Sequence, residues 1–108
     1  MTMPNAESLS SEFRQAADEA DRYLRSISRK AKDDVMYAFL YDDSLAKLKV
    51  YSKLCERPLV SSPGALVQEL KQLRTASVPV PADAIDPQVF RTCRDTHLGL
   101  LIARFEHV

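Results

Sequence analysis

Hydrophobic residues recur at helical spacing along the first third of the chain. Between residues 9 and 31 the apolar positions are separated by steps of three or four, which is typical of one face of an amphipathic helix. The stripe comprises Leu9, Phe13, Ala16, Ala20, Leu24, Ile27 and Ala31. The spacing predicts one long helix over residues 9–31, about six turns at 3.6 residues per turn.

The next segment, residues 35–41, is apolar on every side of a helix. A helix without a polar face has to be covered all round, either by the core or in part by another chain. Tyrosine is enriched at interfaces because it combines an apolar body with a polar tip. We therefore predict a protein interface at Val35, Met36, Tyr37, Phe39, Leu40 and Tyr41, with Leu66, Val67 and Leu70 as further members. Core, dimer contact and partner contact remain open alternatives for residues 35–41.

Aspartates on both sides of this segment predict helix starts. Either Asp33 caps a short helix or the first helix continues through it, and one of Asp42, Asp43 and Ser44 then begins another helix. That helix would place Leu45, Leu48, Tyr51, Leu54 and Cys55 on one face. A further helix is expected to begin at Pro63, with the stripe Leu66, Val67, Leu70 and Leu73.

The last third of the chain is divided by prolines. Residues 75–86 contain Pro79 and Pro81 and predict an extended connector, because residues before proline avoid the helical region. Asp86 and Pro87 predict the start of a final helix that buries Val89, Phe90, Cys93, His97, Leu100, Leu101 and Phe105. Residues 98–108 could alternatively form a strand, but a lone strand has nothing to pair with. The predicted fold is all-α, a compact single-domain bundle of four to five helices spanning residues 1–108.

Composition and charge support this fold class and narrow the function. The 108 residues contain 2 Gly against 6 Pro, which disfavours a β-sandwich with many hairpins. Fifteen basic and fifteen acidic side chains balance, whereas proteins that bind phosphate backbones usually carry a basic excess. The two cysteines, the absence of a signal-peptide pattern and the lack of a bilayer-spanning apolar run predict a cytoplasmic protein with reduced thiols.

Candidate catalytic and metal-binding residues are few. Cys93 and His97 are four residues apart and would face each other on a helix, and a zinc site would also need Cys55 and His107. Cys93 lies on the apolar face, which favours a small buried side chain over a nucleophile or ligand. The aspartate pairs are better explained as helix caps than as metal ligands. No nucleophile elbow or phosphate-binding loop is present, so we predict no enzyme activity, no metal and no cofactor.

A basic stripe on the first helix gives an alternative function. Arg22, Arg25, Arg29 and Lys32 follow helical spacing and could contact phosphates of a nucleic acid. Acidic residues are interleaved with them, which favours a solvated helix face and makes nucleic acid the less favoured partner. A structural or assembly subunit is a second alternative.

The chain resembles a family of small bacterial regulators. The long opening helix, the stretch Ser62-Pro63-Gly64-Ala65-Leu66-Val67 and the stretch Cys93-Arg94-Asp95-Thr96-His97-Leu98 are similar to the QslA family of quorum-sensing antiactivators from pseudomonads. The resemblance implies a helical homodimer without catalysis. It also implies binding to the ligand-binding domain of LasR, a LuxR-type transcription factor, so that the regulator neither dimerises nor binds DNA. The sequence is thus interpreted as a non-enzymatic protein that binds and inhibits another protein.

Overall fold

The structure, a computed structural model, describes residues 6–56, 63–76 and 79–106. These ranges form α1 (Ala6–Ile27), the 3-10 helix η1 (Lys30–Lys32), α2 (Val35–Cys55), α3 (Pro63–Thr75) and α4 (Pro87–Glu106). The described part of the chain contains no strand. Residues 98–106, for which a strand was the alternative prediction, belong to helix α4. The all-α prediction is therefore confirmed for these ranges.

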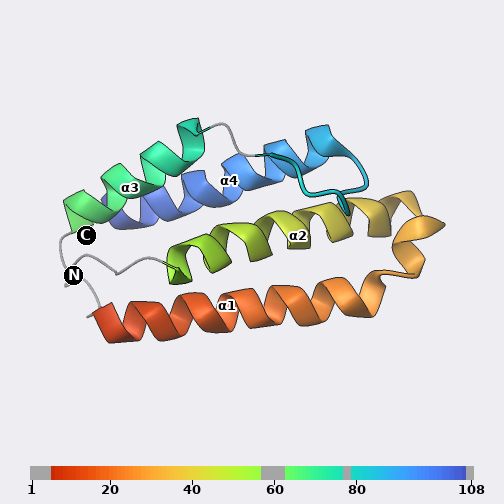
Figure 1. The fold of residues 1–108 in the computed structure, drawn as a ribbon, viewed down its shortest axis with the longest axis horizontal. Helices are drawn as coiled ribbons and strands as arrows, with labels where there is room; N and C mark the ends of the chain where they lie inside the picture. The colour runs from red at the N-terminus through yellow and green to blue at the C-terminus, as the bar shows by residue number, and fades with distance from the viewer. Residues whose placement is uncertain (1–5, 57–62, 77–78, 107–108) are drawn as a thin grey trace.

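The helices form an elongated bundle (Figure 1). α1 runs antiparallel to α2, α3 runs antiparallel to α4, and α2 and α4 lie side by side in the same direction. The molecule measures 44 × 25 × 22 Å along its principal axes. Because α3 has 13 residues and α4 has 20, α3 covers only part of the length of α4, and the connector lies along the remainder.

The apolar stripe of α1 faces the core, with one change of register. Leu9, Phe13, Ala20, Leu24 and Ile27 are buried as predicted. Ala17 is buried in place of Ala16, which is only half-buried, because the contact face of the helix shifts by one residue in its middle turn. Helix α1 ends at Ile27, so the buried Ala31 belongs to η1 and not to one continuous helix.

The turn between α1 and α2 is closed by Asp34 and not by Asp33. The backbone of Asp34 is extended, and its carboxylate Oδ1 accepts hydrogen bonds from the amides of Met36 (2.8 Å) and Tyr37 (3.4 Å). This is the geometry of an N-cap, which satisfies amides that have no partner within the helix. Both predictions for Asp33, a cap and a continuous first helix, are wrong.

Helix α2 is continuous over 21 residues, so the predicted second start at Asp42, Asp43 or Ser44 is wrong. Its buried positions in the second half are Leu45, Ala46, Val50 and Leu54, while Leu48, Tyr51 and Cys55 are half-buried. Asp42 is fully enclosed, at 0 % exposure, and its two carboxylate oxygens accept hydrogen bonds from the backbone amides of Ile85 (2.7 Å) and Asp86 (2.8 Å). The carboxylate therefore holds the connector onto α2.

The connector is shorter than predicted and contains a turn. Thr75 still belongs to α3, and residues 79–86 are non-helical, with a turn closed by the Ala84 amide on the Pro81 carbonyl (3.1 Å). Asp86 then caps α4 through a hydrogen bond from the amide of Gln88 (2.9 Å), as the sequence predicted. Helix α3 begins at Pro63 as predicted.

The main core joins all four helices near the middle and the far end of α4. Phe13 of α1 packs edge-on against Phe105 of α4, with ring centroids 6.5 Å apart, and contacts Tyr51 of α2 at 5.6 Å. The buried face of α4 includes Leu98 and Ile102, whereas Leu100, predicted to be buried, is 64 % exposed. The sequence pattern was ambiguous there because residues 98, 100, 101 and 102 are all apolar and cannot share one helix face.

Candidate protein interface

The first two turns of α2 expose large apolar side chains. Val35 is 89 % exposed, Met36 is 71 % exposed and Phe39 is 52 % exposed. We call these three residues the α2 patch. A helix that was predicted to be covered on all sides is thus uncovered at its beginning, so the core alternative is wrong for this part of residues 35–41.

The position of the α2 patch in the bundle explains its exposure. The beginning of α2 reaches past the beginning of α4, so α4 does not cover its first turn (Figure 1). The α1 side is occupied by the short η1 turn, whose exposed lysines offer no apolar cover. A contiguous apolar surface that the chain itself does not cover is typical of a protein-binding site.

The remaining members of the predicted interface on α2 are half-buried and contact their own chain. The Lys30 ammonium lies 5.1 Å from the centroid of the Tyr37 ring, a cation–π contact at the base of the patch. Tyr41 packs on the smaller core cluster, near Asp83 of the connector. Burial, together with the nearby charge of Asp83, raises the pKa of Tyr41. Leu40 is likewise half-buried, so only part of the surface of Tyr37, Leu40 and Tyr41 is accessible to a partner.

The α3 members of the predicted interface lie in the core. Leu66, Val67 and Leu70 are buried against Leu98 and Phe105 of α4 and neighbouring core residues. They hold α3 on the bundle and present no surface to a partner. The interface prediction is therefore corrected to exclude them, because the exposed face of α3 is its polar one.

A shallow groove between α2 and α4 continues from the α2 patch. It has a volume of about 270 Å³ and is lined by Phe39, Asp43, Gln88, Val89, Thr92, Cys93 and Thr96. Phe39 belongs both to this groove and to the patch, so a side chain from a partner could be inserted beside it. The groove thus extends the apolar surface from the first turns of α2 onto α4.

Cys93 and His97, which the sequence placed on one helix face, both contact Asp43 of α2. His97 Nε2 lies 2.9 Å from Asp43 Oδ1. Burial, together with the charge and hydrogen-bonding influence of the nearby Asp43 carboxylate, raises the pKa of Cys93 to about 11. The thiol is therefore protonated near neutral pH, which is the opposite of what a nucleophilic cysteine needs. The partner Asp43 is 54 residues from His97, so no local spacing could have revealed it.

The described residues contain no group of three or more His, Cys, Asp and Glu side chains arranged to hold a metal ion. Cys55 and Cys93 are both free thiols, and His107 lies outside the described residues. None of the helices in the described ranges offers an apolar stretch of bilayer-spanning length.

The basic stripe of the alternative function lies on the surface. Arg22, Arg25 and Arg29 are exposed around the end of α1, and Lys32 is exposed in η1. Arg25 is engaged locally, since its guanidinium lies 3.2 Å from the Asp21 carboxylate one turn earlier. This ion pair joins one of the four basic residues to one of the interleaved acidic residues.

Comparison of the chain with known protein families, curated proteins and solved structures gives no match in any of the three.

Proposed function

We propose that the protein is a non-enzymatic regulator that binds another protein through the α2 patch and inhibits it. The observation that carries this proposal is the exposure of Val35, Met36 and Phe39, three adjacent apolar side chains on a chain with no net charge. Burying such side chains against a partner contributes about 1.5–3 kcal/mol each, which makes the site favourable for association.

The target that the resemblance implies is a LuxR-type transcription factor. An inhibitor of this type occupies the ligand-binding domain and prevents the regulator from dimerising and binding DNA. An exposed helix start beside a groove suits an inhibitor of this type, because a helix can bind a partner through apolar contacts alone and needs no catalytic residue. The raised pKa of Cys93 supports a non-catalytic role for the groove.

The α2 patch can be altered without disturbing the fold. Val35 and Met36 occupy the first turn of α2 and are highly exposed, and an acidic residue there interacts favourably with the helix dipole. The variant Met36→Asp should therefore stay folded while it places a charge in the interface. Leu100→Asp is the matched control, because Leu100 is 64 % exposed on α4 and lines neither the α2 patch nor the groove.

Binding should be measured by calorimetry against the purified ligand-binding domain of a LuxR-type regulator at low and high salt. We expect Met36→Asp to weaken binding at least about tenfold, Leu100→Asp to leave it unchanged, and salt to have little effect. A gel-shift assay should show that the protein, but not Met36→Asp, displaces the regulator from DNA. Equal binding by both variants would place the interface elsewhere, and direct binding of DNA at low salt would favour the stripe of α1 instead.

A further inference from the structure

A second, larger cleft lies between α2, the end of α3, the connector and α4. Its volume is about 670 Å³, within the range of small-molecule sites in proteins. Its walls are mostly apolar and come from elements far apart in the sequence: Leu48 and Val50 of α2, Leu73 of α3, Pro79, Val80 and Pro81 of the connector, and Phe90 and Leu98 of α4. It does not include any residue of the α2 patch.

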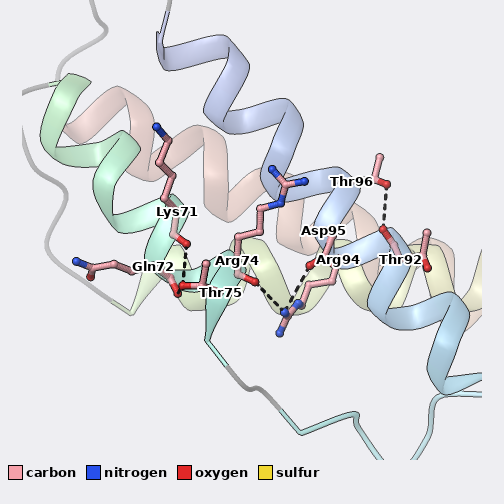
Figure 2. Close-up of polar contacts among 8 residues, drawn as sticks. All are labelled: Lys71, Gln72, Arg74, Thr75, Thr92, Arg94, Asp95 and Thr96. Atoms are coloured by element: carbon pink, nitrogen blue, oxygen red, sulfur yellow. Dashed lines mark hydrogen bonds and ion pairs between the residues drawn. The ribbon is translucent and has the colours of Figure 1, made fainter.

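One charged side chain in this cleft has unused hydrogen-bonding capacity. Arg94 of α4 is 14 % exposed, and its Nε is buried without a hydrogen-bond partner among the described residues. Its Nη2 has only two long contacts, 3.4 Å to the carbonyl oxygen of Arg74 and 3.5 Å to Asp95 Oδ1 (Figure 2). Buried polar groups in native proteins are nearly always paired, so an unsatisfied guanidinium nitrogen calls for an explanation.

The contact with Arg74 gives only part of that explanation. Figure 2 shows the Arg94 side chain reaching from α4 toward the last turn of α3, where a cation interacts favourably with the free carbonyls of the helix end. This role uses Nη2 and leaves Nε unsatisfied. Nε and Nη2 form one edge of the planar guanidinium, and that edge matches the two oxygens of a carboxylate.

The charges around the cleft also favour an anion. Lys49, Lys53 and Arg94 line it, and Glu56 is its one acidic lining residue in the described ranges. Glu56 is paired with Lys53, whose Nζ lies 3.6 Å from the glutamate oxygen. The cleft thus combines apolar walls with an excess of positive charge, although the net charge of the whole chain is zero.

We propose that this cleft binds a small amphipathic carboxylate, with the apolar chain against Val80, Phe90 and Leu98 and the carboxylate on Arg94. The guanidinium turns toward the ligand, exchanges its two long contacts for charge-assisted hydrogen bonds and thereby gives Nε a partner. Lys49, an exposed lining residue of the cleft, adds long-range attraction. This site is independent of the proposed protein interface, because the two share no residue.

Calorimetric titration of the purified full chain with decanoate tests the proposal. Decanoate should bind at a single saturable site, whereas decanol, which has the chain without the charge, and acetate, which has the charge without the chain, should bind at least about tenfold more weakly. Arg94→Gln should weaken decanoate binding about 10- to 100-fold, as expected for the loss of charge-assisted hydrogen bonds. Arg91→Gln is the matched control, since Arg91 is an exposed arginine of the same helix outside the cleft.

Measurements on the unaltered protein keep the test valid if Arg94→Gln fails to fold. Methyl NMR spectra should show decanoate-dependent shifts at Leu73, Val80 and Leu98 and none at Val35. The patch variant Met36→Asp should bind decanoate as the unaltered protein does. The proposal is overturned if decanoate does not saturate below about 1 mM, if decanol binds equally well, if Arg94→Gln folds and binds normally, or if the shifts lie outside the cleft.

Discussion

The buried carboxylate of Asp42 should be one of the most sensitive positions in the protein. Asp42→Asn keeps the size of the side chain but replaces one acceptor oxygen with an amide group that can only donate. Because both oxygens of Asp42 accept from backbone amides, at 2.7 and 2.8 Å, the substitution turns one of these contacts into a clash between two donors. The amide of either Ile85 or Asp86 is then left buried and unsatisfied.

The magnitude follows from these two bonds. A hydrogen bond to a charged group contributes about 1.5–3 kcal/mol, and a buried donor without a partner costs a similar amount. Asp42→Asn should therefore lower the free energy of unfolding by at least about 2 kcal/mol, a large share of the 5–15 kcal/mol typical of a domain.

Urea denaturation followed by circular dichroism at pH 7 measures this change. Asp33→Asn is the matched control, because Asp33 is exposed and does not cap α2, so its unfolding free energy should change by less than about 0.5 kcal/mol. Amide hydrogen exchange should also accelerate at Ile85 and Asp86 in the Asp42 variant. If Asp42→Asn is as stable as Asp33→Asn, the connector is not held by this carboxylate and the reasoning fails.

Three further changes test other features. Gly99→Ala should raise the free energy of unfolding by about 0.5–1 kcal/mol, because Gly99 lies inside α4, where alanine is the better helix former. The added Cβ would meet only the Arg74 side chain, at an ordinary contact distance of 3.8 Å. A loss of stability in urea denaturation would contradict this prediction. Arg104 forms a two-point ion pair with Glu12 and lowers the pKa of Glu12. The ion pair therefore stabilises the fold fully at a pH above the usual glutamate pKa. This stabilisation is lost as the pH falls through the lowered pKa of Glu12. Glu12→Gln should thus cost about 0.5–1 kcal/mol at pH 7 and progressively less as the pH falls below the usual glutamate pKa; a cost that does not change with pH would refute the linkage. Thiol labelling of the native protein at pH 7 should modify the half-buried Cys55 before Cys93, and peptide mass spectrometry showing the reverse order would contradict the raised Cys93 pKa.

Helix starts and helix faces were predictable wherever the chemistry is local. Asp86 and Pro87 begin α4 as expected, because a cap binds amides only two or three residues away. At the other aspartates the same rule had several candidates in a row. It offered Asp33 as a cap where the extended backbone of Asp34 makes it. It also offered Asp42, Asp43 or Ser44 as a cap, and all three lie inside α2.

The sequence indicated the exposed apolar surface in outline, and the structure corrects its extent. The sequence singled out residues 35–41 because the segment lacks a polar face, and its first turns do form an uncovered apolar surface. It could not separate exposed Val35 from buried Leu66, since both are apolar residues at helical spacing. Exposure depends on which neighbour covers a face, and that is not encoded in the spacing along one helix.

The sequence by itself determined the all-α class, the stripe of α1 and the start of α4, because these depend on residues within one or two turns of each other. Only the tertiary structure decided the roles of Asp42 and Asp43, whose partners lie more than forty residues away in the connector and α4. It also decided which apolar residues remain outside the core and brought Arg94 to the wall of a cleft built from three helices and the connector. The physical reason is that hydrogen bonds across the fold and the coverage of a surface depend on how helices pack, whereas caps and periodicity depend only on the chain nearby.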